Sequence, residues 1–261
     1  MYMDIVTSKA DGILTIAFNR PERKNAITGV MYQTMADALL AAEGDTEVRA
    51  ILITGRPEIF TAGNDLEDFM KNSAPVEGVD PSTRPVFQFM RALAASGKPV
   101  VAAVSGAAVG IGTTLLLHCD LVYAADNAKF SMPFAQLGLC PEFASSLLFP
   151  QLAGYPRAAE KLLLGEAFLA QEAFEMGLVS KVLPLADLLP FAQAQAAKLV
   201  ALPAASIRAT KALMKRAKTG AINDTIAAEN ELFGSMLLAP EAKEAFTAFF
   251  QKRKPDFSQF V

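Results

Sequence analysis

Residue types that serve many common catalytic mechanisms are scarce in this chain. Its 261 residues include no tryptophan, one histidine, His118, and two cysteines, Cys119 and Cys140. Two cysteines do not make a disulfide framework, and any Ser-His or Cys-His catalysis would have to run through His118. That histidine lies in the apolar run Leu115–Cys119, where a buried, hydrogen-bonded structural role is the simpler interpretation. With scattered carboxylates besides, the sequence predicts neither a metal site nor a bound cofactor.

Long apolar runs and an excess of one charge sign are also missing. No segment reaches the roughly 18 uncharged apolar residues of a membrane helix, so we expect no membrane partner. Lysine and arginine total 24 against 27 acidic residues, which gives no reason to expect nucleic acid as a partner. Met1–Val6 lacks the features of a signal peptide, and Ser258–Val261 is not the peroxisomal address. These absences together predict a cytoplasmic location.

Apolar side chains, by contrast, make up 52% of the chain, enough for a sizeable core. The first half alternates strand and helix patterns, starting with a β-hairpin in which Asp11-Gly12 turns between Met3–Ser8 and Ile13–Phe18. Several strands read as apolar on both faces, which predicts an α/β architecture. The expected strands are Ala50–Gly55, Val100–Val104, Leu121–Ala124 and Lys129–Met132, and the expected helices are Ala26–Ala42 and Gly112–Cys119.

The pattern after Pro141 is almost entirely helical. It is interrupted by a strand-like stretch, Val179–Leu183, and by a loop that we expect between Pro184 and Pro190. Helices are predicted at 191–201, 204–218, 221–238 and 240–252. We divide the chain into a core, residues 1–200, and a helical region, residues 201–261, and expect a mobile loop at Asn72–Pro85.

The last helices carry more apolar side chains than a terminal appendage needs. Two interpretations stay open, packing on a neighbouring subunit or packing on the chain's own core. The residues concerned are Leu232, Phe233, Met236, Leu237, Phe246, Phe249 and Phe250.

Two turns that contain glycine follow buried strands, Ala62-Gly63-Asn64 and Val109-Gly110-Ile111-Gly112. Glycine allows a tight turn and a close approach of a ligand to the main chain. The second turn leads into a helix, whose first N–H groups are unpaired and lie at a positive dipole end. Both turns therefore suit the stabilisation of a developing oxyanion. The alternative is that these glycines only permit close packing of helix and strand.

Other glycine-rich motifs do not fit the second turn. A dinucleotide fingerprint would need glycine or alanine where the chain has Leu115, and a phosphate-binding P-loop would need a lysine that is absent. A G-x-S-x-G nucleophile elbow occurs nowhere in the chain. From the spacing alone, donation to an oxyanion and close packing of helix and strand both stay open as roles for the two turns.

Ordered motifs along almost the whole chain resemble the crotonase (enoyl-CoA hydratase/isomerase) superfamily. They are Pro21 with Lys24-Asn25-Ala26, Phe60–Leu66, Gly106–Gly112, Asp120–Ala124, Gly177-Leu178-Val179 and Lys252–Pro255. The resemblance implies a spiral of ββα units and a helical C-terminal region that forms homotrimers or dimers of trimers. It also implies an acyl-CoA thioester substrate, with CoA as part of the substrate rather than a cofactor. The implied oxyanion hole consists of the backbone N–H groups of Asn64 and Ile111.

The resemblance also bears on the reaction. Hydratases of this family use two glutamates, at positions that are Thr114 and Phe134 in this chain. Hydration needs a base for water and an acid for carbon, so we do not expect an ordinary hydratase. One carboxylate remains well placed, Glu142 in Pro141-Glu142. Its alternative role is local, since proline followed by glutamate is favourable at the start of a helix.

Glu142 gains weight from a closer resemblance. Gly63–Leu66 together with Pro141-Glu142-x-x-Ser145-Ser146 resembles the peroxisomal-type Δ3,Δ2-enoyl-CoA isomerases, in which the matching glutamate is the sole base. The implied reaction moves a proton from C2 to C4 of a 3-enoyl-CoA and yields trans-2-enoyl-CoA. The alternatives are another crotonase-type enzyme (a weak hydratase, a dehalogenase or an isomerase of aromatic-acid catabolism) or a non-catalytic scaffold that binds acyl-CoA.

Substrate contacts are inferred from position in the family pattern. Lys24 and Ala26 would meet the pantetheine and phosphates, and Ala62, Asp65 and Leu66 would border the adenine. Gly110, Thr114 and Phe134 would line the remainder of the site, with Phe134 and Phe143 bordering the acyl group and raising the pKa of Glu142. Both phenylalanines have core filling as their alternative role, and Lys24 has that of a solvated surface charge.

Overall fold

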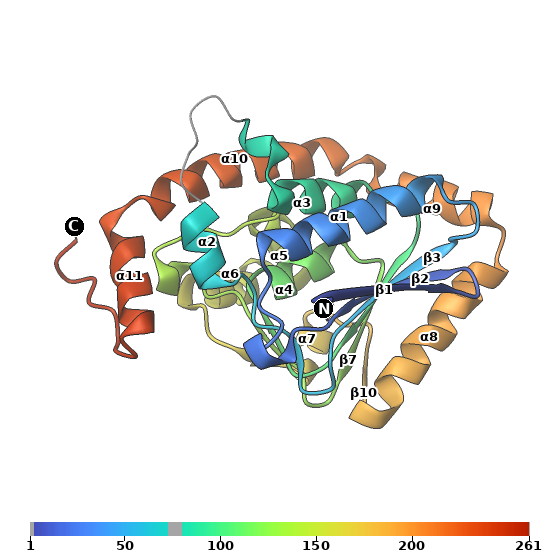
Figure 1. The fold of residues 1–261 in the computed structure, drawn as a ribbon, viewed down its shortest axis with the longest axis horizontal. Helices are drawn as coiled ribbons and strands as arrows, with labels where there is room; N and C mark the ends of the chain where they lie inside the picture. Colours follow the sequence, from blue (N-terminus) through green and yellow to red (C-terminus); the bar gives the residue numbers. More distant parts are fainter. Residues whose placement is uncertain (1–2, 73–79, 261) are drawn as a thin grey trace.

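Two β-sheets form the centre of the computed structural model, which describes residues 3–72 and 80–260 (Figure 1). All strand pairs are parallel except β1–β2 and β8–β9. The six-stranded sheet has the order β1 (Ile5–Ala10), β2 (Ile13–Phe18), β3 (Ala50–Thr54), β5 (Val100–Val104), β7 (Leu121–Ala125) and β10 (Lys181–Leu183). The four-stranded sheet has the order β4 (Ile59–Thr61), β6 (Ala107–Val109), β8 (Lys129–Ser131) and β9 (Phe168–Leu169).

The chain repeats one unit along both sheets. A long strand of the first sheet (β3, β5 or β7) is followed by a short strand of the second (β4, β6 or β8) and then by helix. At one corner, between β5 and β6, Gly106 has φ +63°, and a Cβ there would lie 1.9 Å from the carbonyl oxygen of Glu58. Only glycine fits so tight a corner. The predicted spiral of ββα units is therefore confirmed.

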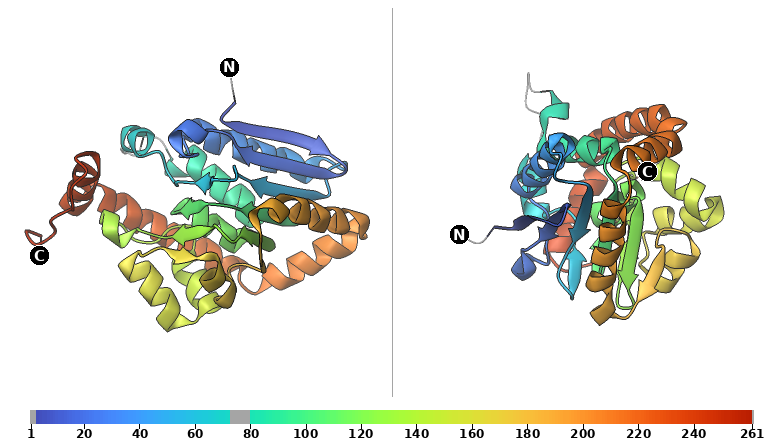
Figure 2. Two further views of the ribbon diagram at one scale, coloured as in Figure 1. Left: turned by 90° about the horizontal axis from the view of Figure 1, so that it is seen from below. Right: turned by 90° about the vertical axis from the view of Figure 1, so that its right-hand side faces the viewer.

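Strands β3, β5 and β7 separate two layers of core, as the apolar pattern on both faces predicted. In β3, Ala50 and Leu52 pack toward helix α8 (Leu185–Ala201), whereas Ile51 and Ile53 belong to the main core. Helices α1 (Gly29–Gly44) and α3 (Pro85–Ala95) pack against each other over the main core. Figure 2 shows α8 running across the face of the sheet that α1 and α3 leave open.

Three helices complete the chain, α9 (Ala204–Arg216), α10 (Thr219–Leu237) and α11 (Pro240–Phe250). Ile226, Ala242 and Phe246 join the main core, whereas Phe249 and Phe250 are exposed. The chain's own core thus takes up part of the C-terminal apolar surface. Packing of the remainder on another subunit stays a prediction.

Some elements differ from their predictions. The helix expected from Ala26 starts at Gly29, because Thr28 accepts a hydrogen bond from the Met31 N–H (3.3 Å) and caps it. The helix expected at Gly112–Cys119 is a single α-turn, α4 (Ile111–Thr114), followed by a 3-10 turn, η3 (Leu115–His118). The dipole expected for the second glycine turn is therefore that of one turn only.

A loop was wrongly predicted between Pro184 and Pro190. Pro190 lies inside α8, in its second turn, where the missing proline N–H removes one hydrogen bond without ending the helix. Helices α2 (Leu66–Asn72) and α3 and strands β4, β6 and β9 were not predicted as separate elements.

Part of the expected Asn72–Pro85 loop, residues 73–79, lies outside the described residues. The rest contains the 3-10 turn η2 (Pro81–Thr83) and the first residue of α3. The remaining helices are α5 (Ser145–Ala153), α6 (Tyr155–Leu164) and α7 (Ala170–Glu175). Within the two described ranges, each helix is too short or too polar to cross a lipid bilayer.

Candidate active site

The two glycine turns touch each other at one edge of the smaller sheet. They follow β4 and β6, which are parallel neighbours, so their carboxyl ends share one edge. A Cβ on Gly63 would lie 2.7 Å from the Val109 carbonyl oxygen, and one on Gly112 would lie 2.5 Å from Cγ2 of Thr61. Close packing is therefore one reason for these two glycines, and that packing places the turns side by side.

Gly110 has a different reason to be glycine. Its φ of 56° and ψ of −119° fall in a region that side chains rarely allow, and no heavy atom lies within 4 Å of where a Cβ would stand. The main chain at Gly110 is therefore open to the adjoining cavity, as a turn that receives a ligand requires.

The main-chain N–H groups of Asn64 and Ile111 have no hydrogen-bond acceptor among the described residues. Their neighbours do: the Gly110 N–H donates to Ser131 at 2.9 Å, and the Asp65 N–H to Ile27 at 2.9 Å. Because buried main-chain donors are almost always paired, two unpaired donors at one cavity indicate a place for an acceptor that the chain itself does not supply.

The cavity beside these donors has a volume of about 490 Å³. Seven of the eight residues predicted to bind substrate line it together with Asn64 and Ile111, namely Lys24, Ala26, Ala62, Asp65, Leu66, Gly110 and Phe134. Thr114 lines neither this cavity nor the smaller one next to it, because it is completely buried beneath Glu142. Its predicted contact with substrate is thus replaced by a contact with Glu142.

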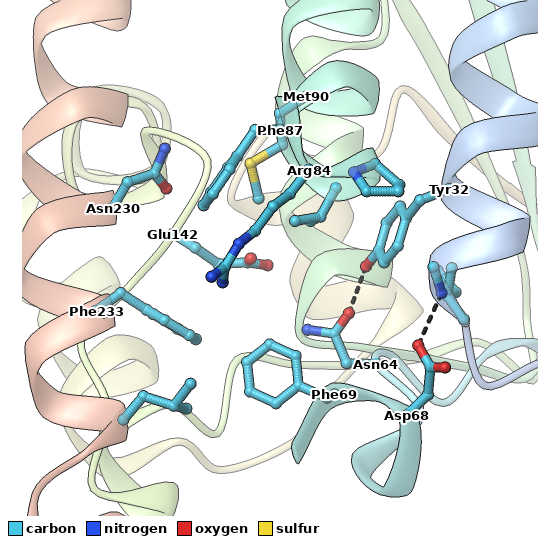
Figure 3. A pocket seen from close by; sticks show the side chains of 16 residues that line it. Tyr32, Asn64, Asp68, Phe69, Arg84, Phe87, Met90, Glu142, Asn230 and Phe233 are labelled. Carbon is cyan, nitrogen blue, oxygen red and sulfur yellow. Dashed lines mark hydrogen bonds between the residues drawn. The ribbon is translucent and has the colours of Figure 1, made fainter. Parts of the chain in front are cut away.

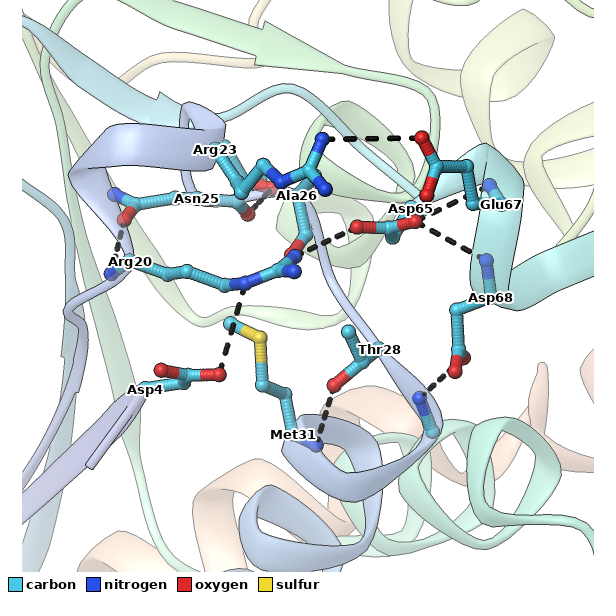
Figure 4. A network of polar contacts seen from close by, with 12 residues as sticks. Asp4, Arg20, Arg23, Asn25, Ala26, Thr28, Met31, Asp65, Glu67 and Asp68 are labelled. Carbon is cyan, nitrogen blue, oxygen red and sulfur yellow. Dashed lines mark hydrogen bonds and ion pairs between the residues drawn. The ribbon is translucent and has the colours of Figure 1, made fainter. Parts of the chain in front are cut away.

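The side chain of Asp65 makes its polar contacts with other residues of the chain (Figure 4). Its carboxylate forms an ion pair with Arg20 at 2.7 Å and accepts hydrogen bonds from the Glu67 and Asp68 N–H groups, both at 3.1 Å. Burial alone would raise the pKa of Asp65, but Arg20 and the Asp68 N–H hold that pKa below its ordinary value. Asp65 therefore caps α2 and joins it to the loop after β2.

A smaller, apolar cavity of about 150 Å³ adjoins the first and shares Asn64, Phe69 and Phe233 with it. Figure 3 shows Glu142 beside α10, which carries Asn230 and Phe233, and near Phe87 and Met90. Most of the walls are apolar and come from α2, α3 and α10 and from the segment before α1: Ile27, Phe69, Pro85, Val86, Phe87, Met90, Phe233 and Leu237. This cavity can take up an apolar chain.

Glu142 lines the apolar cavity and is only 5% exposed. Oγ1 of Thr114 donates a hydrogen bond to its Oε1 at 3.3 Å. Burial, with repulsion from Glu229, raises the pKa of Glu142 to about 8, although the Thr114 hydrogen bond acts in the opposite direction. Such a carboxyl exchanges protons readily near neutral pH, which is the property of a general base.

The predicted positions of Phe143 and Phe134 beside the acyl group need correction. Phe143 is fully buried and lines neither cavity, because it stacks on His118 behind the loop. Phe134 lines the larger cavity only. The apolar surroundings of the acyl cavity come instead from α2, α3 and α10, which are distant in sequence.

The alternative role of Glu142 as a helix-starting residue is wrong. Helix α5 begins at Ser145, and the two residues between, Phe143 and Ala144, have φ of 58° and 55°. Glu142 therefore sits on an irregular turn before the helix, and its side chain is directed into the apolar cavity rather than along a helix.

Tyr32 is a site residue that the sequence did not indicate. From α1, its Oη donates a hydrogen bond to Oδ1 of Asn64 at 2.5 Å, and it lines the cavity that holds Glu142. Burial and the charge of Glu142 keep the pKa of Tyr32 well above its ordinary value. Arg84, Asn230 and Phe233 were missed as well, since no motif marks them and only the folded chain brings them to Glu142.

Known proteins resemble this chain along nearly its full length. Residues 8–260 match the family described as enoyl-CoA hydratase/isomerase. The 2,3-dehydroadipyl-CoA hydratase of Escherichia coli K12 is 33% identical over 97% of the chain and 98% of that protein. Enoyl-CoA delta isomerase 3, peroxisomal, of Mus musculus is 40% identical over 69% of the chain and 57% of that protein.

The crystal structure of an enoyl-CoA hydratase/isomerase from Pseudoalteromonas atlantica T6c superimposes with a TM-score of 0.92 at 37% identity. It covers 98% of this chain and all of that one. Sequence and fold therefore agree, and the chain belongs to the enoyl-CoA hydratase/isomerase family, the crotonase superfamily of acyl-CoA enzymes.

Proposed function

We propose that this enzyme is a Δ3,Δ2-enoyl-CoA isomerase in which Glu142 is the only catalytic base. The observation that carries the proposal is the placement of this one buried carboxyl in the apolar cavity, next to the unpaired N–H groups of Asn64 and Ile111. Thr114 and Phe134 stand where a hydratase of the family would have its two glutamates.

The substrate would extend through both cavities. CoA would lie in the larger cavity, the unsaturated acyl chain would enter the smaller one, and the thioester carbonyl would lie where the two adjoin at Asn64. The two free N–H groups would then donate to the thioester oxygen. Each such donor typically lowers the barrier by about 2.7–4 kcal/mol, because it meets charge that develops only in the transition state.

The chemistry needs one proton carrier. The Glu142 carboxylate takes a proton from C2 of the 3-enoyl-CoA, and the electron pair moves onto the thioester oxygen as a dienolate. The same carboxyl then returns its proton at C4, the double bond forms between C2 and C3, and Glu142 is again ionised. Because the pKa of Glu142 is raised to about 8, it is a stronger base than an ordinary carboxylate and can pass the proton in both directions.

The mammalian relative named a delta isomerase supports this reaction, and the bacterial relative named a 2,3-dehydroadipyl-CoA hydratase represents the main competing one. Hydration would need a second acid-base group near Glu142. Among the described residues, Asp68 is the other carboxylate on the apolar cavity, and it accepts a hydrogen bond from the Gly29 N–H at 2.8 Å. That bond directs Asp68 toward α1, which favours a single-base isomerase.

The test follows a 3-enoyl-CoA by the ultraviolet absorbance of its conjugated product. Glu142→Gln keeps the shape of the side chain and removes the base, so we expect kcat to fall by about 10²–10⁴-fold. Glu231→Gln, an exposed glutamate on α10, is the matched control and should leave kcat unchanged. Full turnover by E142Q, or efficient formation of 3-hydroxyacyl-CoA from trans-2-enoyl-CoA by the wild type, would reject the proposal.

We propose in addition that the helical region from residue 201 onward joins subunits in a homotrimer or a dimer of trimers. The exposed apolar side chains of α10 and α11, including Leu232, Phe249 and Phe250, support this assembly. The 27.8 kDa chain should then give three or six times its own mass by light scattering, and a monomeric mass would reject the proposal.

A further inference from the structure

Two buried ionisable side chains have no part in the proposed proton transfer, and both contact the loop that carries Glu142. Glu229, on α10, is 7% exposed. Its carboxylate accepts hydrogen bonds from the Ala144 N–H at 2.5 Å and from the N–H and Oγ of Ser146 at 3.0 Å and 2.5 Å. The N-cap residue of helix α5, Ala144, makes no side-chain capping hydrogen bond. Glu229 therefore caps the N-terminus of α5 from a helix that is distant in the sequence.

His118, the single histidine, holds the same loop from the opposite side. Its Nε2 lies 2.8 Å from the carbonyl oxygen of Phe143, and its ring stacks on Phe143 with centroids 3.8 Å apart. A carbonyl oxygen only accepts, so Nε2 carries the proton. Burial lowers the pKa of His118 to about 4, which keeps the ring neutral. The predicted structural role of His118 is thus confirmed, with a specific partner.

The two contacts meet on one peptide group. The carbonyl oxygen of Phe143 and the N–H of Ala144 are the two ends of the same peptide bond, so His118 and Glu229 hold that bond between them. The residues on either side both have left-handed φ, at 58° and 55°. Residues other than glycine avoid this conformation unless their surroundings enforce it.

We propose that His118 and Glu229 are positioning residues: by fixing the Phe143–Ala144 peptide they direct the carboxylate of Glu142 into the apolar cavity. The inference rests on the proposed role of Glu142 as the base. It gives α10 a second task, because the helix that supplies Asn230 and Phe233 to the cavity wall also supplies Glu229. The position of α10 therefore sets both the cavity wall and the orientation of the Glu142 carboxylate.

Glu229 also acts on Glu142 through its charge. The charged and titratable side chains around Glu142 are Glu229 from α10, Tyr32 from α1, Asp68 from α2, Arg84 before α3 and Cys140 from its own loop. Of these, Glu229 is the carboxylate whose charge opposes ionisation of Glu142. Its removal should therefore make Glu142 easier to ionise while it loosens the loop.

The first experiment compares two substitutions of His118 in the full-length enzyme. His118→Gln keeps an amide N–H near the position of Nε2 but loses the stacked ring, whereas His118→Phe keeps a stacked ring and loses the donor. If the hydrogen bond positions the loop, kcat should fall on the order of 100-fold in H118F, with KM nearly unchanged, and H118Q should keep most of the activity. A role in packing alone predicts the reverse order, and that order would overturn the proposal.

The second experiment compares Glu229→Gln with the control Glu231→Gln, two residues further along α10. In E229Q the new NH₂ group faces an N–H of the loop, so kcat should fall on the order of 100-fold, as in H118F. The acid limb of the kcat/KM profile should also move to lower pH, because a negative charge near Glu142 is gone. If E229Q and E231Q had the same kcat and the same acid limb of the kcat/KM profile, the proposal would be overturned.

Deuterium uptake by the amides of residues 143–147 separates this inference from the proposed function. H118F and E229Q should both take up deuterium in this segment faster than H118Q and E231Q. If the wild type fails to turn over any 3-enoyl-CoA but this order of uptake holds, the isomerase proposal fails, and the proposal that His118 and Glu229 fix the Phe143–Ala144 peptide stands. Equal uptake in all variants would overturn the proposal that His118 and Glu229 fix this peptide, whatever the activity.

Discussion

The two glycine turns and the Glu142 loop border adjoining cavities, yet they are built in different ways. The turns contribute main-chain N–H groups to the site. Their positions are fixed because the parallel strands β4 and β6 end at the same edge of the sheet and because Gly63 and Gly112 allow the two turns to touch. The loop offers a side chain, and groups from α4, η3 and α10 hold it: Thr114, His118 and Glu229. The oxyanion donors therefore depend on the pairing of two strands and on glycine conformation, whereas the base depends on side chains from three further elements.

The comparison predicts which substitutions each region tolerates. At the turns, side chains can change as long as the main chain keeps its path, because the donors belong to the main chain. At the Glu142 loop, a substitution far away in sequence can misdirect the base. Single substitutions that leave the rest of the fold unchanged can test both statements.

Among substitutions that leave Glu142 in place, the largest loss of kcat is expected at Gly110, where a side chain would force the main chain away from φ 56° and ψ −119°. Gly110→Ala should move the Ile111 N–H and reduce kcat by about 10²–10³-fold, the usual loss for one oxyanion donor. Gly154→Ala is the matched control, since Gly154 also has positive φ (+80°) with nothing within 4 Å of its Cβ position. Equal kcat for the two variants would contradict the role of the turn.

The next effect concerns the pH dependence of stability at Glu142. Its pKa is raised from 4.5 to about 8 by burial, so the folded state binds this proton more tightly than the unfolded state does. The stabilisation is complete below the unfolded pKa and is lost as pH rises toward 8.

Glu142→Gln cannot ionise, so its Tm should exceed that of the wild type increasingly between pH 5 and pH 9. The gain should reach several degrees, at about 2–4 °C per kcal/mol. Scanning calorimetry of both proteins across this range measures the difference, with E231Q as control. A difference in Tm that stays constant with pH would contradict the raised pKa of Glu142 in the folded protein.

The smallest effect is expected at Tyr32, which touches the first turn through the side chain of Asn64. Tyr32→Phe removes one hydrogen bond worth about 0.5–1.5 kcal/mol, so kcat/KM should fall at most about tenfold. Tyr155→Phe, at a site 74% exposed, should change nothing. A loss as large as that of E142Q would mean that Tyr32 takes part in the chemistry and that the single-base account is incomplete.

The same difference explains how much of the site could be predicted from sequence. Gly63 and Gly110 could be recognised because their backbone conformations require glycine, and their strands were evident as apolar runs. The position of Glu142 was indicated by a family pattern. The shape of its loop was not, because Phe143 and Ala144 carry no glycine signal and are held by His118 and Glu229, the latter 85 residues from Ala144.

The fold shows the same limit. The alternation of strands and helices predicted an α/β spiral, whereas details set by tertiary contacts were missed. Pro190 was interpreted as a helix boundary, but the residues before it are already helical and pack on the sheet, with Leu188 buried in α8. The apolar wall of the cavity was missed for the same reason, because α2, α3 and α10 meet only in the folded chain.

The most direct test of the single-base mechanism follows a hydrogen label through one turnover. A 3-enoyl-CoA that carries deuterium at C2 is converted in ordinary water, and the trans-2-enoyl-CoA product is analysed for deuterium at C4. Because Glu142 is 5% exposed and returns the proton it has taken, we predict that part of the label appears at C4. Product without any deuterium at C4 would contradict a shielded transfer by one carboxyl.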